Sequence, residues 1–430
     1  MFIAQQSNDQ PASRKHGRVG SLGVRKRTLV VVPSLPLPAR GGADMRNWEN
    51  VKALLSLGQV AVFGLAGGSE ERPAEADIEV WRTSRDPALG RRIEVAIGSS
   101  ESPEGHPSDA YYSTEAVREL EGIVRKFEPD LVLLEVLWTH HYIDPLADQG
   151  LPMALDAHNV EGPLAIDLAA VSSGGREARL RRASLAEHLA KIESAAFERA
   201  DQIWVPSERD AQLAAHRYGT TTPIEVVPNA LDVDSYAGSP ARDGEQIRAT
   251  DPTVVLTARF DYAPNAIAAR FLVEEVLPRL WERLPTARLQ LVGSEPTSFL
   301  GAAAAKEPRI EVMGPVPEVT PFIARAFAVA VPLFQGGGTR LKVLEAFATG
   351  TPVVATRKAV EGLDAEEGAH FVAAESADEF AAALTVLWTD QARAGEIAAR
   401  ARRLVRGRYS REVVCRCVAS AIRRLEACTR

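Results

Sequence analysis

Short apolar runs alternate with longer amphipathic stretches along the chain from residue 28 onward. The runs are rich in Val, Leu, Ile and Ala, and each has the length of a buried strand. Continuous apolar strands separated by helices are typical of a parallel sheet covered on both faces. The predicted strands are residues 28–33, 59–65, 131–135, 152–156, 202–205, 254–256, 288–292, 310–313, 329–334, 352–356 and 370–373. The pattern therefore predicts a doubly wound α/β fold.

The pattern is interrupted at AGSPARDGEQIRATDP, a segment rich in Ala, Gly, Pro and charge. A length of 430 residues also fits two domains. We predict a disordered basic tail, two Rossmann-like domains joined by a linker, and a last helix that packs back on the N-terminal domain. Their bounds are, in this order, 1–27, 28–236, 237–252, 253–408 and 409–430. Ligands of doubly wound sheets bind at the carboxyl ends of the strands, so we expect a site in a cleft where the two sheets face each other.

Composition narrows the class of protein. The net charge of −7 argues against a nucleic-acid partner, because such domains are usually basic. No apolar run reaches the ~20 residues that span a bilayer, and the polar, basic start lacks the apolar core of a signal peptide. We therefore expect a cytoplasmic protein. Its three cysteines, all near the C-terminal end, are interpreted as reduced thiols on a helix.

Two basic segments leave a second interpretation open. The tail and the stretch REARLRR at residues 176–182 are interpreted first as a disordered end and a solvated helix face. The second interpretation is peripheral contact with the inner face of the membrane or with a lipid-linked acceptor.

The most informative segment is VAVPLFQGGGTRLKVLEAFATGTPVVAT, residues 329–356. We expect a buried strand ending at Phe334, a turn made by three glycines, and a helix from about Thr339 to Gly350. Glycines let a backbone approach a ligand closely, and a helix N-terminus attracts phosphate. Arg340 and Lys342 add positive charge at the end where cations are unfavourable without an anion. The alternative is a tight turn with solvated cations. Glu345 then either binds a ribose diol or is an ordinary surface residue.

This segment resembles the signature helix of the GT4 group of retaining glycosyltransferases, which have the GT-B fold. Further segments are similar to that family and follow its order along the chain. They are LDAHNVEG (155–162), PNALDVDSY (228–236), LTARFDYAPNAIAARFLVEEVLPRL (256–280), LQLVGSEP (289–296) and VMGPVPEV (312–319). The HN-V-E part is similar to the branch that makes bacterial exopolysaccharides.

The resemblance implies transfer of a sugar from a nucleotide-sugar donor to a glycan or lipid-linked acceptor, with retention and without a metal or other cofactor. Arg259 and Lys342 would neutralise the donor diphosphate, and His158 would lie near the anomeric carbon. Glu345 would hold the ribose hydroxyls, and Val316 lies in the loop whose backbone contacts the base. The remaining donor-binding positions implied are Gly41, Gly42, Gly337, Gly338, Thr339, Arg340 and Leu341.

The chain departs from the family pattern at two positions of the donor site. Gly337 stands where many members have a glutamate that touches the donor sugar, and Asn265 stands near an expected lysine. Two alternative functions therefore stay open: a non-catalytic nucleotide-sugar-binding or scaffold subunit, and a nucleotide-sugar epimerase of the same fold. Glu135 and Glu161 are candidates to line the cleft. The pair His140–His141 is interpreted as a loop after a strand, with a metal site as the alternative.

Overall fold

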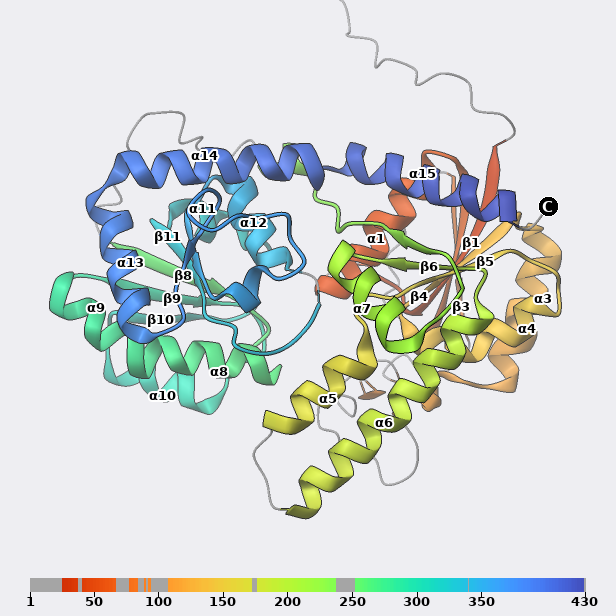
Figure 1. The fold of residues 1–430 in the computed structure, drawn as a ribbon, viewed down its shortest axis with the longest axis horizontal. Coiled ribbons are helices and arrows are strands. Elements are labelled where there is room, and N and C mark those ends of the chain that lie inside the picture. Colours follow the sequence, from red (N-terminus) through yellow and green to blue (C-terminus); the bar gives the residue numbers. More distant parts are fainter. Residues whose placement is uncertain are drawn as a thin grey trace, which may run out of the picture.

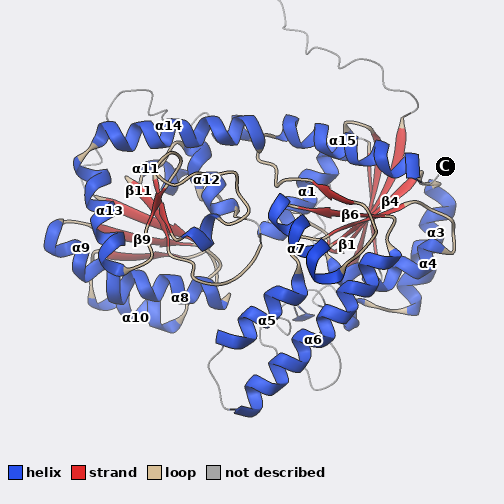
Figure 2. Cartoon of the chain, in the orientation of Figure 1, coloured by secondary structure: helices blue, strands red, loops and turns tan. Residues whose placement is uncertain are grey.

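The computed structural model describes residues 25–37, 41–66, 77–83, 89, 92–93, 107–171, 176–236, 252–338 and 340–428. The expected tail (1–27) lies almost wholly outside these residues, as does the expected linker (237–252). In the described part, two domains lie side by side, each built on a parallel sheet flanked by helices (Figures 1 and 2). The predicted α/β class with two Rossmann-like domains is confirmed.

The N-terminal sheet has the strand order β3-β2-β1-β4-β5-β6-β7 among the described strands, all in parallel pairs. The strands are β1 Lys26–Ser34, β2 Gly58–Ala66, β3 Ile78–Arg82, β4 Leu131–Glu135, β5 Met153–Asp156, β6 Gln202–Val205 and β7 Ile224–Val226. The helices are α1 Gly42–Leu55, α3 Thr114–Phe127, α4 Ile143–Ala147, α5 Glu161–Val171, α6 Arg176–Arg199 and α7 Glu208–Tyr218, with short 3-10 turns η1 Pro107–Tyr111, η2 Leu137–Tyr142 and η3 Val233–Tyr236. Strand order reverses beside β1, so a crevice opens between β1 and β4.

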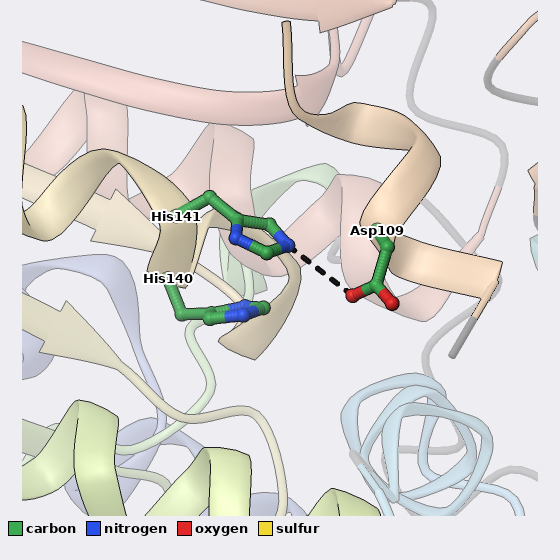
Figure 3. A group of neighbouring side chains, drawn as sticks. All are labelled: Asp109, His140 and His141. Carbon is green, nitrogen blue, oxygen red and sulfur yellow. Dashed lines mark hydrogen bonds and ion pairs between the residues drawn. The ribbon is translucent and has the colours of Figure 1, made fainter. Parts of the chain in front are cut away.

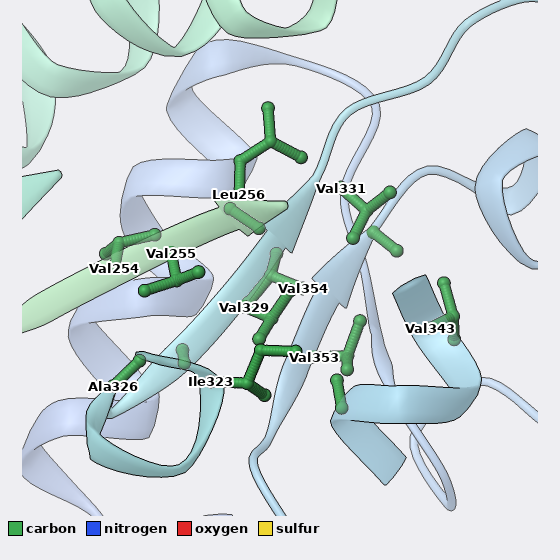
Figure 4. Packing of buried hydrophobic residues seen from close by; sticks show 14 of the residues in the cluster. Val254, Val255, Leu256, Ile323, Ala326, Val329, Val331, Val343, Val353 and Val354 are labelled. Carbon is green, nitrogen blue, oxygen red and sulfur yellow. The ribbon is translucent and has the colours of Figure 1, made fainter. Parts of the chain in front are cut away.

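The C-terminal sheet has the order β10-β9-β8-β11-β12-β13. Its strands are β8 Thr253–Thr257, β9 Arg288–Val292, β10 Ile310–Met313, β11 Ala328–Val331, β12 Val353–Ala355 and β13 Val372–Ala373. Around it lie α8 Ala263–Phe271, α9 Leu277–Arg283, α10 Ser298–Lys306, α11 Thr320–Arg325, α12 Leu341–Thr349, the 3-10 turn η5 Arg357–Val360, α13 Ala377–Thr389 and α14 Gln391–Arg408. Figure 4 shows Val343 of α12 on the side of the sheet where β12 lies, with the aliphatic side chains of β11 and β8 further across the same core. The core thus fixes the direction in which α12 points.

The last helix, α15 Arg411–Cys428, leaves the C-terminal domain and packs against α1 (Figure 1). Its apolar face, with Val414, Val418 and Ile422, completes the core on one side of the N-terminal sheet. Arg411 pairs with Glu49 of α1 at 2.7 Å and with Asp232 at 3.0 Å. The helix therefore ties the two domains together at the side opposite α5 and α6.

The structure differs from the predicted elements in three ways: one strand ends earlier, two edge strands were missed, and one helix is interrupted. The strand expected to end at Phe334 ends at Val331, because Pro332 has no N–H to continue the ladder, and Phe334 is exposed. The edge strands β3 and β7 were missed: β3 is only partly buried, and β7 has three residues, so neither gives a continuous apolar run. The expected single helix at 265–284 contains a π-type turn at Leu272–Val276, directly before Pro278, where a helical hydrogen bond is lost.

Candidate functional site

The candidate site lies where the β11–α12 loop of the C-terminal domain meets the β5–α5 loop of the N-terminal domain. A Cβ atom on Gly337 would lie 2.7 Å from Leu164 Cδ2 and 3.0 Å from Asn159 Oδ1. Both of these residues belong to the other domain, so the two loops are in contact across the cleft. A larger residue at position 337 would have to displace the side chains of Leu164 and Asn159, which gives the departure from the family's glutamate a packing reason.

The glycine loop leads directly into the N-terminus of α12. Gly336 and Gly338 have φ values of 98° and 92°, which L side chains rarely adopt. The helix begins at Leu341 and ends at Gly350, whose φ of 73° makes it a left-handed C-cap. Its N-cap residue, Arg340, makes no side-chain capping hydrogen bond, and the Val343 N–H already donates to the Arg340 carbonyl at 2.9 Å, so the N–H groups of Leu341 and Lys342 are the ones left for a ligand. Such an end is suited to bind an anion.

Two cations lie at this helix end. Arg340 is 7% exposed and donates only long hydrogen bonds, of 3.2 and 3.3 Å, to the carbonyls of Gly337 and Gly336. Its Nε atom is buried with no hydrogen-bond partner among the described residues, and its guanidinium lies 4.0 Å from the nearest Glu361 oxygen. Burial therefore lowers the pKa of Arg340. An under-satisfied buried guanidinium is costly, and an anion at the helix end would offset that cost.

Lys342 lies on the first turn of α12, and its ammonium donates to Asn265 Oδ1 at 2.7 Å. The Asn265 amide in turn donates to the carbonyl of Arg259 at 2.8 Å. Burial, and then the charge of Arg340, lower the pKa of Lys342 to about 7. The ammonium of Lys342 thus lies next to Asn265, near the position where the family pattern places a lysine.

Arg259 is held differently from the other two cations. Its guanidinium forms a two-pronged pair with Asp261 at 2.7 and 2.9 Å, and its side chain is half exposed. It follows β8 in the loop before α8, on the same edge of the sheet as the glycine loop. A ligand that used Arg259 would have to share it with Asp261 or displace that carboxylate.

Glu345 is buried one turn further along α12, so the interpretation of a surface residue is wrong. Burial raises its pKa to about 7, although a hydrogen bond from Tyr236 at 3.4 Å and the charge of Lys342 act in the opposite direction. Tyr236 comes from η3, which packs in the hydrophobic core of the C-terminal domain. A buried carboxylate beside a cation can accept hydrogen bonds from a polyol.

The N-terminal face of the cleft carries a buried ionic network centred on Asp156, the last residue of β5. The guanidinium of Arg46 on α1 donates hydrogen bonds to both carboxylate oxygens of Asp156, at 2.8 and 2.5 Å. It also donates to Val227 O and Asn229 Oδ1. Burial alone would raise the pKa of the Asp156 carboxyl, but the charge of Arg46, the hydrogen bond and charge of His158 and the hydrogen bonds of Arg46 together hold it well below its usual range. Both side chains are almost fully buried.

His158 and Glu135 extend this network towards the cleft. His158 Nε2 lies 3.2 Å from Glu135 Oε2 and 3.3 Å from Asp156 Oδ2. Burial and the neighbouring charge of Asp156 raise the pKa of Glu135 to about 7. The next residue, Val136, has a φ of 67°, which is strained for a β-branched side chain and of a kind that clusters at functional sites.

The other predicted positions are distributed as follows. Gly41 is the extended N-cap of α1, Gly42 is its first residue, and Val316 is half-buried in the loop after β10. Leu341 is buried as the first residue of α12, and Thr339 lies outside the described residues. The structure brings together the segments of His158, Gly337 and Gly338, because Asn159 Oδ1 would lie 3.0 and 3.3 Å from Cβ atoms on the two glycines.

The sequence interpretation missed Arg46, Asp156 and Asn50. A usable signal existed for one of them: Asp156, like the candidate Glu135, ends an apolar run, and neighbouring parallel strands end at the same edge of a sheet. The spacing of Arg46 and Asn50 places them on one face of a helix, but nothing in the sequence shows that this face turns inward.

His140 and His141 lie on the 3-10 turn after β4, a short distance from this network in sequence. Figure 3 shows His141 turned towards Asp109, with the ring of His140 against it. The His141 Nε2 to Asp109 Oδ1 distance is 3.2 Å, and the three residues are close enough to hold a metal ion. His140 Nδ1 is occupied by the Leu137 carbonyl at 3.0 Å. The group is partly exposed, and it stands apart from the contact of the two loops.

A hollow in the domain seam is lined by Arg209, Arg357 and Lys358. Each of these cations already has a carboxylate partner: Glu361 for Arg209 and Lys358, and Glu367 with Glu375 for Arg357. These pairs join or stiffen the domains and leave no uncompensated charge for a ligand. Over the described part of the chain, no helix has the length and apolar character needed to cross a membrane.

Comparison with protein-family models gives two matches, one for each domain. Residues 40–235 match the model described as glycosyltransferase family 4, and residues 251–390 match that of glycosyl transferases group 1. The two matches meet where the pattern of strands is interrupted. No curated protein matches the chain at a significant level.

Solved structures of glycosyltransferases share the whole fold at low sequence identity. Sucrose-phosphate synthase from Thermosynechococcus elongatus has a TM-score of 0.70 and 19% identity, over 94% of this chain and all of that one. HepE of Anabaena in complex with UDP and glucose has a TM-score of 0.64 and 16% identity, over 93% of this chain and 100% of its own. For the E. coli trehalose-6-phosphate protein bound with UDP-2-fluoro glucose, the values are 0.62 and 14%, over 93% and 98%. The two family matches and this shared architecture identify the chain as a GT4-like glycosyltransferase with the GT-B fold.

Proposed function

We propose that this protein moves a sugar from a nucleotide-sugar donor to a glycan or lipid-linked acceptor, with retention at the anomeric carbon and without a metal ion. The proposed setting is polysaccharide biosynthesis, of the exopolysaccharide type, in the cytoplasm at the inner face of the membrane. The similarity of LDAHNVEG to the exopolysaccharide branch supports this setting. The donor class is supported by HepE and the E. coli protein, whose structures contain UDP with glucose and UDP-2-fluoro glucose.

One observation carries the donor assignment: an uncapped helix N-terminus beside a buried arginine whose Nε has no partner among the described residues. Helix N–H groups and buried cations both favour an anion, and a diphosphate would satisfy both at once. Glu345, one turn further along α12, is placed to accept hydrogen bonds from the ribose hydroxyls. The helix N-terminus with Arg340 and the carboxylate of Glu345 therefore match the diphosphate and the ribose of a nucleoside diphosphate.

In the proposed reaction the bond between the sugar and the diphosphate breaks, and negative charge develops on the leaving phosphate. Arg259, Lys342 and the N-terminus of α12 stabilise that charge, which is usually the largest catalytic contribution. They supply the charge that a divalent cation supplies in metal-dependent transferases. With retention, the acceptor hydroxyl attacks from the side of the leaving group, whose phosphate oxygen takes its proton.

A thermal-shift screen against UDP-, GDP-, ADP- and dTDP-sugars tests the donor site. A ligand at 100 times its Kd stabilises the fold by ~2.7 kcal/mol, which is readily detected. We expect a shift with one nucleotide family that is unchanged by EDTA and lost in Lys342→Ala. Lys306→Ala, an exposed lysine at the end of α10, is the matched control and should keep the shift.

A product assay with the nucleotide sugar that gives the shift, with and without acceptors, separates the alternatives. Binding without transfer to any acceptor would favour the non-catalytic scaffold subunit, and an altered nucleotide sugar formed without acceptor would favour the epimerase. A shift that EDTA abolishes would overturn metal independence. If no nucleotide sugar gives a shift, the diphosphate site itself is wrong.

The acceptor side of the proposal includes peripheral membrane contact through the α5–α6 hairpin. Figure 1 shows the two helices side by side, projecting from the N-terminal domain. The first turns of α6 carry Arg176, Arg179 and Arg181 on exposed positions, and Leu180 is 62% exposed beside them. An apolar side chain among arginines is suited to an anionic lipid surface.

Co-sedimentation with phosphatidylglycerol and phosphatidylcholine vesicles tests this contact. We expect binding to the anionic vesicles alone, weakened by salt and lost when Arg176 and Arg179 are both changed to Glu. The same double change at Arg400 and Arg403 of α14 is the matched control. Equal binding by both variants would exclude the hairpin as the contact.

A further inference from the structure

Asp109, His140 and His141 form a cluster of ligating side chains that the proposed transfer reaction does not use (Figure 3). The histidines belong to η2, the turn directly after β4, and Asp109 belongs to η1, the turn before α3. One ligand atom from each residue lies within 4.8 Å of the other two. Since η2 follows the carboxyl end of β4, the cluster stands at the edge of the sheet where doubly wound domains bind their ligands.

The spacing of His141 and Asp109 suits a shared metal ion. His141 Nε2 lies 3.2 Å from Asp109 Oδ1, a distance that also suits a hydrogen bond. Two ligand atoms that each lie about 2.1 Å from a tetrahedral zinc ion are about 3.4 Å apart. A metal ion can therefore replace the proton between these two atoms with little movement of either side chain.

The ring of His140 is held in the way that is usual for a metal-binding histidine. Its Nδ1 lies 3.0 Å from the carbonyl oxygen of Leu137, and a carbonyl only accepts hydrogen bonds. In the neutral ring Nδ1 therefore carries the proton, and Nε2 has the lone pair for a metal. Metal-binding histidines almost always donate their second nitrogen to a carbonyl or carboxylate, because this bond fixes the tautomer and the orientation of the ring.

The backbone under the cluster is held by buried contacts. Tyr142 Oη donates to the Tyr111 carbonyl at 2.9 Å, which fastens η2 to η1. Thr139 Oγ1 donates to the Val136 carbonyl at 2.9 Å, and Val136 has the strained φ of 67°. Strain that surrounding contacts maintain is typical of functional sites. The two turns therefore present the ligating side chains from fixed positions, as a binding site requires.

The side chains themselves remain accessible and adjustable. Those of Asp109 and His141 are 42% and 27% exposed, so an ion can reach them from solvent. The rings of His140 and His141 lie 3.8 Å apart between centroids, with 36° between their planes. One ion on both rings needs a somewhat wider angle, which a rotation of the partly exposed side chains provides. Asp109 and His141 are also 32 positions apart, so an ion that joins them closes a long loop of the chain.

We propose that Asp109, His140 and His141 bind one divalent transition-metal ion of the zinc class, which joins η1 to η2 and stabilises this edge of the N-terminal domain. Imidazole ligands favour Zn²⁺, Co²⁺ and Ni²⁺, whereas Mg²⁺ and Ca²⁺ prefer oxygen ligands alone. With three protein ligands, water completes the coordination. The ion has no part in the sugar-transfer step, so this inference does not rest on the proposed function.

Isothermal titration calorimetry with zinc chloride tests the site in the full chain after treatment with EDTA and removal of the chelator. We expect one equivalent of zinc to bind, with an affinity that is ~10²-fold or more lower in Asp109→Asn and in His141→Ala. Excess Mg²⁺ should not compete. Circular dichroism checks that the variants fold, as expected for partly exposed positions. The absence of zinc binding in the native protein, or equal binding in both variants, would overturn the proposal.

His188→Ala is the matched control, because His188 is an exposed histidine of α6 outside the cluster. This variant should bind zinc like the native protein. A loss of binding in His188→Ala that is as large as in His141→Ala would mean that scattered surface histidines collect the metal, and the proposed site would be wrong.

Two further measurements examine the geometry and the stabilising role. Co²⁺ should give visible d–d absorption bands in the native protein that disappear in His140→Ala. Zinc should slow hydrogen exchange of the amides in η1 and η2, and it should not do so in Asp109→Asn. Bands that persist in His140→Ala would remove this residue from the ligand set. Zinc that binds without protecting these turns would overturn the joining of η1 to η2.

EDTA separates this site from the donor site. Removal of the ion should lower the melting temperature of the free protein, whereas the additional shift caused by a nucleotide sugar should stay the same. Equal melting temperatures with zinc and with EDTA would reject the metal site and leave the donor site intact. A protein that is stabilised by zinc but by no nucleotide sugar would keep the metal site and reject the proposed function.

Discussion

The two faces of the cleft are built by opposite principles. The C-terminal face presents a helix end and two cations with few partners, Arg340 and Lys342, whose pKa values burial lowers. The N-terminal face contains a closed network in which Arg46 and Asp156 satisfy each other almost completely. An unsatisfied charge is a place for a ligand, and a satisfied one is a fixed part of the scaffold. The comparison predicts that mutations on the N-terminal face cost stability, and mutations on the C-terminal face cost binding and rate.

The largest expected effect is on stability, from Asp156→Ala. The change leaves the Arg46 guanidinium buried without its carboxylate partner. Removing one partner of a buried ion pair typically destabilises a protein by 3–5 kcal/mol, so we expect a loss of about 4 kcal/mol in the free energy of unfolding. Urea unfolding followed by circular dichroism measures it. Glu396→Ala, which breaks the exposed pair with Arg400, should cost about 1 kcal/mol or less. Equal losses of unfolding free energy in the two variants would show that the buried network does not stabilise the N-terminal domain.

Lys342→Ala tests the opposite face. Removing one group that stabilises charge on a leaving phosphate should lower kcat by ~10² or more, and we expect the same of Arg259→Ala. Because the partners of Lys342 and Arg259 lie in loops and at a helix end, the unfolding free energy should change little. Steady-state kinetics with unfolding curves separate the two effects. Near-normal turnover in both variants would reject the diphosphate site.

The contact between the two faces is tested by Gly337→Ala. The new methyl group would overlap Leu164 and Asn159, and overpacking of this kind costs about 1–3 kcal/mol. We expect a fall in kcat/KM of roughly tenfold, which Leu164→Ala in the same chain should partly reverse. Gly301→Ala, where no atom lies within 4 Å, is the matched control. A Gly337→Ala protein with full activity would show that catalysis does not need this approach of the domains.

The contrast also explains what the sequence alone could predict. Short runs rich in apolar residues are visible in sequence, so the fully buried β4 and β6 and the partly buried β9 and β10 were predicted to the residue. The glycine loop was found because its backbone conformation requires glycine. Of the ionic network, Glu135 and His158 were candidates, but Arg46 and Asp156 were not, since they are ordinary charged residues until the fold turns them inward. Burial of Glu345 could not be inferred either, because it follows from the packing of α12, almost all of whose residues are buried.

The smallest effect is the pH dependence of donor affinity. In the empty cleft the pKa of Lys342 is about 7, so above pH 7 the lysine is largely neutral, and binding a diphosphate must recharge it with a proton from solution. Affinity should therefore fall as pH rises above 7, by at most about tenfold per unit, until the pKa of the bound state is reached. Calorimetry of nucleoside diphosphate binding in buffers of different ionisation enthalpy measures the proton taken up. Lys342→Arg stays charged throughout this range and should abolish the uptake. Release of a proton by the native protein would mean that the carboxyl of Glu345, whose pKa is also about 7, dominates the linkage, and that the ribose end governs recognition more than the diphosphate end.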